Sequence, residues 1–148
     1  MFYRTGGLAV LNPILPSEVM LNIRPVTQTS AMERIEGYGE VILNHTPIQA
    51  GDILIIHSVS GRNTIAIEMA LAAKQKGIQV IAITNLTYSK QVTSRHRSGK
   101  RLYECADYVI DNCGDRTNIQ HNFGWQDWVQ YRKSAGSIKH FLCKYPCM

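Results

Sequence analysis

Hydrophobic and polar positions are most regularly arranged between residues 51 and 111. Ile53 to Ile56 form a short, continuous apolar run, which is typical of a strand buried on both faces of a parallel sheet. A polar turn, Ser58 to Asn63, comes next. Thr64 to Lys76 then shows a helical pattern, which Gly77 ends. We therefore predict a strand, a turn and a helix at the centre of the fold.

The same alternation continues toward the C-terminus. Ile78 to Ile83 is rich in β-branched residues and predicts a second strand. Ser98 to Arg101 is expected to begin a short helix that Leu102 to Ala106 continues, and Asp107 to Asp111 predicts a third strand. Strands that alternate with helices predict an α/β fold in which parallel strands are joined by right-handed crossovers.

The N-terminal part carries weaker patterns. Leu8 to Leu11 predicts a short first strand, and a proline-rich connection follows it, with one helical turn at Ser17 to Leu21. Ser30 and Glu33 form a capping box, which predicts a helix from Ser30 to about Asn44.

One face of this expected helix is apolar. The residues expected toward the core are Met32, Ile35, Gly39, Ile42 and Leu43. Glu36 lies at the edge of the apolar stripe, where a water-facing position is expected and a position in a cleft is the alternative.

Composition limits the class of protein. A chain of 148 residues with 45% hydrophobic residues is long enough for one folded domain and is not a disordered chain. A formal net charge of +5 favours acidic or phosphorylated ligands. The basic residues lack the motifs of nucleic-acid binding, and no apolar run is typical of a signal peptide or a membrane span. We expect a cytoplasmic protein that binds neither nucleic acid nor membrane.

The pattern weakens after residue 112. Cys113 to Met148 shows no clean strand or helix period, so a divergent, poorly ordered tail is expected. His140, Cys143 and Cys147 share a helical spacing that would suit zinc. A fourth ligand is missing and Pro146 would break the helix, so no metal site is predicted.

The turn after the first central strand carries the clearest chemistry. A strand that leads into a helix through a Ser/Gly turn directs backbone N–H groups beyond the carboxyl end of the sheet, where they bind anions. Ser58 and Ser60 add hydroxyl donors, and Gly61 lets a ligand approach the backbone. The alternative is that the two serines only cap the helix. Their Ser-x-Ser-Gly spacing favours an anion site.

Other polar residues are expected at the same edge of the sheet. Thr84 and Asn85 end the second central strand, where ligands of open α/β sheets bind. Ser89 and the loop from Ser94 to Arg101 are placed to close the same pocket.

Several common sites are missing from the sequence. It contains no P-loop and no Gly-x-Gly-x-x-Gly after a strand, so no nucleotide cofactor is predicted. His57 and His96 have no Ser or Cys partner in a nucleophile elbow, and a structural role is the expectation for each.

The Ser58-Val59-Ser60-Gly61 segment resembles the signature Ser-x-Ser-Gly-x-Thr of the sugar isomerase (SIS) domain family. The threonine of that signature falls on Asn63, and Thr64 comes one place later. The resemblance to an uncharacterised bacterial group of SIS proteins extends over Phe2 to Asn112. The segments that carry it are Phe2–Leu8, Arg34–Tyr38, Ser94–His96 and Ser98–Tyr103.

This resemblance implies a three-layer, flavodoxin-like sandwich that binds phosphosugars and forms homo-oligomers when full length. Its binding residues would include Ser58, Ser60 and Gly61. The match begins after the family's first strand and its carboxylate-bearing helix, and it ends before the family's C-terminal helix. We therefore expect a partial SIS domain, incomplete at both ends, at residues 1–112, followed by the divergent tail at 113–148.

The missing segments bear on catalysis. A chain without the family carboxylate is expected to bind a phosphorylated sugar without converting it. The alternative is an active sugar-phosphate isomerase or lyase, in which Glu36 would be the nearest carboxylate to act as a base. His96 would then act from its loop without a partner.

Overall fold

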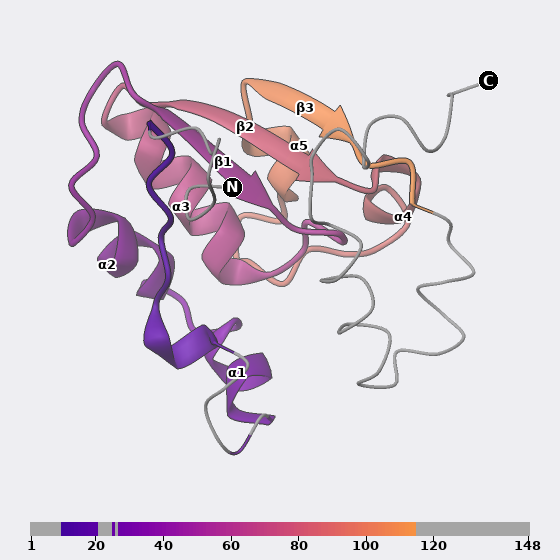
Figure 1. Ribbon diagram of the computed structural model, residues 1–148. Coiled ribbons are helices and arrows are strands. Elements are labelled where there is room, and N and C mark those ends of the chain that lie inside the picture. The colour runs from indigo at the N-terminus through magenta and orange to yellow at the C-terminus, as the bar shows by residue number, and fades with distance from the viewer. Residues whose placement is uncertain (1–9, 21–24, 26, 115–148) are drawn as a thin grey trace, which may run out of the picture. The chain divides into compact units, whose positions relative to one another are not determined.

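The computed structural model describes residues 10–20, 25 and 27–114, and its regular elements lie in the unit from Ile14 to Asp111 (Figure 1). Residues 10–13 and 112–114 belong to a second unit and contain no helix or strand. The strand predicted at Leu8–Leu11 is therefore absent at Val10 and Leu11, and its first half lies outside the described residues. His140, Cys143, Cys147 and the predicted tail after Gly114 also lie outside them.

Three parallel strands form the sheet in the order β1-β2-β3. They are β1 (Ile53–His57), β2 (Gln79–Thr84) and β3 (Tyr108–Asp111). The crossover from β1 to β2 contains α3 (Thr64–Gln75), and the one from β2 to β3 contains α4 (Leu86–Ser89) and α5 (Leu102–Cys105). The predicted α/β fold with parallel strands is confirmed.

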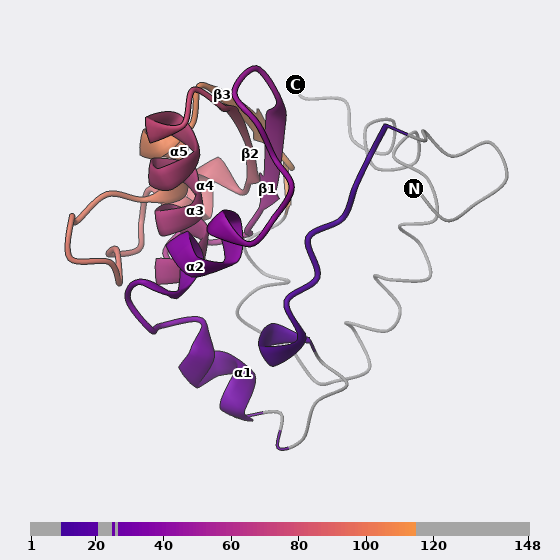
Figure 2. The ribbon, with the colours of Figure 1, turned by 90° about the vertical axis from the view of Figure 1, so that its left-hand side faces the viewer.

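Alternate residues of the strands form the core. Helices α3 and α5 lie on the same face of the sheet, as Figure 2 shows. Val80 and Ala82 of β2 are fully buried there, together with Ile67 of α3 and Leu102 of α5. The packing on this face places α3 and its N-terminus against the sheet.

The opposite face of the sheet is apolar but exposed. Ile53 and Ile55 of β1 are 55% and 49% exposed, and Ile110 of β3 is 41% exposed. In the unit from 14 to 111, the helices that contact the sheet lie on the other face. The prediction that β1 is buried on both faces is therefore wrong for the described structure.

The helix predicted from Ser30 to Asn44 is two helices. They are α1 (Thr27–Met32) and α2 (Tyr38–Asn44), and Ser30 lies inside α1 instead of capping it. The chain turns between them, where Gly37 has a φ of 86°. The capping box was wrong because Glu33 bonds to a distant residue, accepting a hydrogen bond of 2.7 Å from Asn63 Nδ2.

The expected apolar face of this region is only partly buried. Gly39, Ile42 and Leu43 of α2 are buried against α3, whereas Ile35, in the break, is 46% exposed. The helical turn predicted at Ser17–Leu21 is present as the 3₁₀ helix η1 (Ser17–Val19). Among the described helices, none has the length and apolar character needed to span a membrane.

Candidate anion-binding site

The loop of residues 58–63, here called the serine loop, connects β1 to α3 at the carboxyl ends of β1 and β2. Ser58 extends the pairing of these strands, because its N–H donates a hydrogen bond of 3.0 Å to the carbonyl of Ile83. The next residue, Val59, is fixed by two hydrogen bonds of 3.0 Å, which its carbonyl accepts from the Asn85 N–H and the Thr84 hydroxyl. The loop carbonyls are thus turned toward the protein.

After Ser58, the backbone donors of the serine loop have no hydrogen-bond partner among the described residues. The N–H groups of residues 59–64 donate no hydrogen bond to any described residue. Asn63, the N-cap of α3, makes no side-chain capping bond. The Ser58 and Ser60 hydroxyls likewise make no hydrogen bond within the described part of the chain. The alternative in which the serines only cap α3 therefore does not match the structure.

Such a run of donors has a clear chemical consequence. Unpaired N–H groups at a helix N-terminus carry the positive end of the helix dipole, and together they attract a phosphate, sulfate or carboxylate. Helix α3 has 12 residues, so its dipole is well developed. The geometry of the serine loop suits an anion.

The predicted site residues divide into an outer and an inner group. Ser58, Ser60 and Asn63 are half-buried and belong to the surface of the loop. The inner group is buried to 1% exposure or less and consists of Thr64, Thr84, Asn85 and Ser89. These inner residues lie behind the loop, and the structure brings both groups together at one edge of the sheet.

Gly61 joins the two groups. Its φ is 57°, and a Cβ atom at this position would lie 3.0 Å from the Ser89 hydroxyl and 3.2 Å from Cβ of Leu102. Its carbonyl accepts a hydrogen bond of 2.8 Å from the Leu102 N–H. The Ser89 hydroxyl is buried and has no hydrogen-bond partner among the described residues. A glycine is required here by both the backbone conformation and the available space.

The loop from Ser94 to Arg101, which was predicted to close the site, lies beside the serine loop. Arg95 Nη1 donates a hydrogen bond of 2.8 Å to Asn63 Oδ1, and the Arg95 N–H donates one of 3.0 Å to the Arg62 carbonyl. Asn63 Nδ2 bonds in the other direction to Glu33. Asn63 therefore connects three segments of the chain that are far apart in sequence.

Glu68 is a buried acidic residue of α3 that the sequence pattern did not single out. This residue of α3 is 7% exposed, and its carboxylate lies 3.8 Å from Nε2 of the buried His96. Nδ1 of His96 lies 3.2 Å from the Ser98 backbone nitrogen and 2.8 Å from the Ser98 hydroxyl, while Nε2 faces Glu68. His96 was expected to have no partner, and this expectation is wrong. A glutamate within the apolar stretch of α3 was the available signal.

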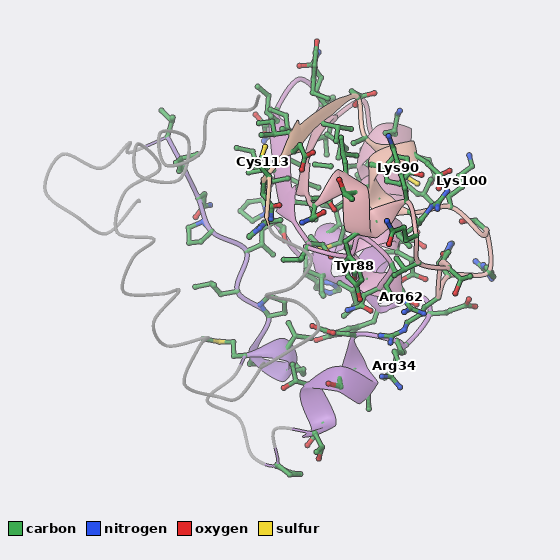
Figure 3. All side chains as sticks on the ribbon, turned by 90° about the vertical axis from the view of Figure 1, so that its right-hand side faces the viewer. Arg34, Arg62, Tyr88, Lys90, Lys100 and Cys113 are labelled. Carbon is green, nitrogen blue, oxygen red and sulfur yellow. The ribbon has the colours of Figure 1, made fainter. Side chains whose placement is uncertain are left out.

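Positive charge collects next to the serine loop. Partial loss of hydration lowers the pKa of the exposed Arg95, and the nearby guanidinium groups of Arg62 and Arg34 lower this pKa further. Burial raises the pKa of Glu33, while Arg95 and Arg34 act in the opposite direction. Figure 3 shows Arg34, Arg62 and Tyr88 along one side of the molecule. The electrostatics of this edge favour a negatively charged ligand.

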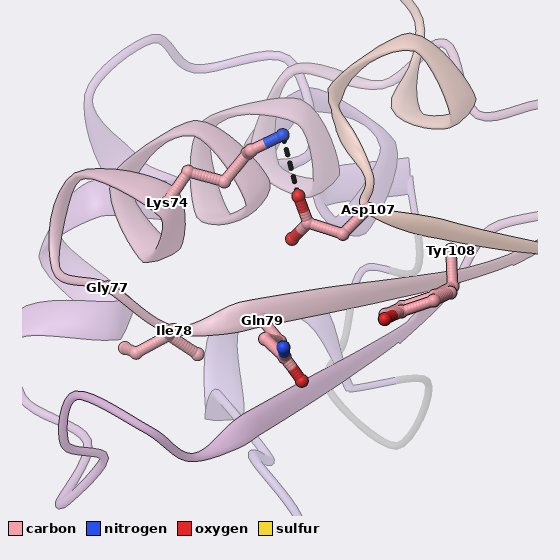
Figure 4. Close-up of a pocket in the computed structure, with 6 residues that line it drawn as sticks. All are labelled: Lys74, Gly77, Ile78, Gln79, Asp107 and Tyr108. Carbon is pink, nitrogen blue, oxygen red and sulfur yellow. Dashed lines mark ion pairs between the residues drawn. The ribbon is translucent and has the colours of Figure 1, made fainter.

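A shallow pocket lies at the other end of the sheet (Figure 4). It is lined by Lys74, Gly77, Ile78, Gln79, Asp107 and Tyr108. Lys74 and Asp107 form an ion pair of 2.9 Å there, and this bond lowers the pKa of Asp107. Ligands of open parallel sheets bind at the carboxyl ends of the strands, so this pocket is not the expected site. No cluster of metal-binding side chains is present in the part of the chain that the structure describes.

The described structure is a parallel α/β unit whose serine loop lies at the carboxyl edge of its sheet. Residues 1–85 match the model of the SIS domain. The chain belongs to the SIS domain family, which comprises carbohydrate-derivative-binding and isomerase-like proteins.

Several bacterial proteins are similar in sequence. A UPF0309 protein of Oceanobacillus iheyensis is 62% identical over 114 residues, which are 77% of this chain and 46% of that protein. A UPF0309 protein of Shouchella clausii is 60% identical over the same shares of both chains. A UPF0309 protein of Streptomyces coelicolor is 43% identical over 74% of this chain and 44% of its own length. The chain thus spans less than half the length of these relatives.

Proposed function

We propose that this chain binds a phosphorylated sugar or sugar derivative, with the phosphate held in the serine loop. The observation that carries the proposal is the run of N–H groups at residues 59–64 without partners among the described residues, at the uncapped start of α3. The hydroxyls of Ser58 and Ser60 add two donors. Membership of the SIS family supports a sugar derivative as the rest of the ligand.

The two groups of site residues would have different roles. Ser58, Ser60 and Asn63, with the backbone at Gly61 and Thr64, would contact the phosphate. Thr84, Asn85 and Ser89 would keep the loop in its binding conformation, because they are buried behind it. A preformed loop does not need to be ordered when ligand binds, and this lowers the entropic cost of binding.

We further propose that the chain binds its ligand without isomerising it. The two acid–base groups that the sequence suggested are held by other parts of the protein. Glu36 accepts a hydrogen bond of 3.1 Å from the Arg97 N–H, and His96 is 8% exposed between Glu68 and Ser98. A general base must reach the proton that it removes, at a distance of about 3 Å.

Calorimetric titration with glucose 6-phosphate tests the binding site. The double variant Ser58→Ala/Ser60→Ala is expected to lose about 1–3 kcal/mol of binding free energy, the usual value of hydrogen bonds to a charged group. Ser30→Ala, which removes an exposed serine hydroxyl on α1, is the matched control and is expected to bind like the unaltered chain. Equal affinity of the double variant and the control would contradict the proposal.

A coupled assay with several hexose and heptose phosphates tests the absence of turnover. The expected rate is that of the uncatalysed reaction. Turnover well above this rate that Glu36→Gln abolishes would show that the chain is an isomerase and that Glu36 is its base.

A further inference from the structure

Arginines from three separate segments lie near the serine loop: Arg95 lies beside Arg62, and the charge of Arg34 acts on Arg95. Arg34 lies in the break between α1 and α2, Arg62 in the serine loop itself, and Arg95 in the segment after α4. Two of the three are held by contacts, because Arg95 bonds to the Arg62 carbonyl and to the Asn63 side chain. The group formed by Arg34, Arg62 and Arg95 is called the arginine cluster below.

The arginine cluster is short of negative charge. None of its three guanidinium groups forms an ion pair with a described residue. Two neighbouring arginines do have carboxylate partners: Arg97 lies 4.0 Å from Glu36, and Arg101 lies 3.0 Å from Glu104.

The carboxylate that acts on the cluster is Glu33. It contacts the cluster through Asn63 and attracts Arg95 and Arg34. Among the described residues, one carboxylate against three guanidinium groups leaves two positive charges without compensation. Like charges held close together raise the free energy of the folded protein, and a bound anion removes this cost.

The serine loop has enough donors for one phosphate without the arginines. Six backbone N–H groups, of residues 59–64, have no partner among the described residues, and Ser58 and Ser60 add their hydroxyls. A phosphate monoester presents only three terminal oxygens. Guanidinium groups are suited to bind a carboxylate or phosphate through two parallel hydrogen bonds.

We propose that the arginine cluster is a second anion-binding subsite, and that the ligand is a sugar phosphate with a second acidic group. This inference rests on the proposed function, because the serine loop would hold the first phosphate. The second group is a carboxylate or another phosphate, since both have the charge and geometry that arginine recognises. Arg34 and Arg95 are exposed, so their guanidinium groups are accessible to it.

Calorimetric titrations with three probes test the subsite. Glucose 6-phosphate carries one acidic group, 6-phosphogluconate adds a carboxylate, and fructose 1,6-bisphosphate adds a second phosphate. The double variant Arg62→Gln/Arg95→Gln removes two charges of the cluster. Arg97→Gln is the matched control, because it removes the same charge two residues farther along the loop, where Glu36 is the partner. Thermal unfolding of each variant establishes that it is folded.

At least one doubly acidic probe is expected to bind the unaltered chain about tenfold more tightly than glucose 6-phosphate, as one charge-assisted bidentate contact would give. The double arginine variant is expected to lose this preference, because the doubly acidic probes lose more affinity than glucose 6-phosphate does. The control Arg97→Gln is expected to keep the preference for a doubly acidic probe and the affinity for glucose 6-phosphate. The better of the two doubly acidic probes identifies the second group.

Two results would overturn the subsite. The first is equal binding of all three probes by the unaltered chain. The second is an equal loss of affinity for all three probes in the double variant, which would mean that the arginines bind the first phosphate. In both cases glucose 6-phosphate still binds, so the proposed function stands. Failure of every probe to bind would instead overturn the function and the subsite together.

Discussion

The carboxylate of Glu68 accepts a hydrogen bond of 2.9 Å from the backbone N–H of Gly39. Its other oxygen accepts one from the N–H of Gly37, so a buried acidic side chain of α3 holds the start of α2. The same carboxylate lies beside His96. Glu68 thereby connects α2, α3 and the loop that carries Arg95.

Glu68→Gln is expected to lower the free energy of unfolding by about 1–3 kcal/mol, because the amide group turns a donor toward one of two buried backbone donors. Urea denaturation measures this change. Glu40→Gln, on the exposed face of α2, is the control and is expected to change stability by less than about 0.5 kcal/mol. Similar stabilities of the two variants would mean that the Glu68 contacts do not hold α2.

Gly61→Ala is expected to destabilise the chain and to abolish binding of glucose 6-phosphate. The new methyl group would lie 3.0 Å from the Ser89 hydroxyl, and the left-handed backbone adds about 1–2 kcal/mol of strain. Gly51→Ala is a matched control, because Gly51 has a φ of 91° but no atom within 4 Å of the added Cβ. Thermal unfolding and calorimetry distinguish the two. A Gly61→Ala variant that binds like Gly51→Ala would show that the loop tolerates a side chain.

Glu33→Gln is expected to increase the affinity for glucose 6-phosphate by about two- to fivefold, the effect of one partly exposed charge. Glutamine can still accept the hydrogen bond from Asn63 while the negative charge is lost. The pKa of Glu33 is raised by burial, and its titration makes the affinity ratio of the variant and the unaltered chain depend on pH. As pH falls through this pKa, the unaltered carboxyl becomes neutral, and the advantage of the variant is expected to disappear. Calorimetry over a range of pH values would contradict this if the affinity ratio were constant.

Asp107→Asn is expected to make the chain less stable at neutral pH but not in acid. The pKa of Asp107 is lowered in the folded protein by its bond to Lys74 and then by the Val80 N–H. Its contribution is therefore complete above the unfolded-state pKa of about 3.9 and is lost as pH falls through the folded-state pKa. Urea denaturation at several pH values measures the difference. Lys74→Gln is expected to give a similar profile, and a difference that persists in acid would contradict the ion pair.

The sequence predicts the centre of the fold well, because its signals there are local. The apolar run at Ile53–Ile56 corresponds to β1 at Ile53–His57, and the helical pattern from Thr64 to Lys76 corresponds to α3. The Ser-x-Ser-Gly turn identified the serine loop because a strand, a turn and a helix follow one another directly. Neighbouring residues are sufficient to specify such a unit.

The features that the sequence did not predict depend on distant contacts. The break after α1 is formed by bonds from Glu33 to Asn63 and from Gly37 to Glu68, which connect residues 30 and 31 positions apart. The arginine cluster likewise combines residues from three segments. A local helical pattern cannot show that its polar residues have partners elsewhere, so a capping box was the natural but wrong interpretation of Ser30 and Glu33.

An NMR titration with glucose 6-phosphate tests the serine loop as the binding site most directly. Two-dimensional spectra would record the chemical shift of each backbone amide as ligand is added. We expect saturable shifts concentrated at the amides of residues 59–64, because these N–H groups would acquire a phosphate oxygen as acceptor. Shifts concentrated instead around Lys74, Gly77 and Tyr108, or no shifts at millimolar ligand, would contradict the site.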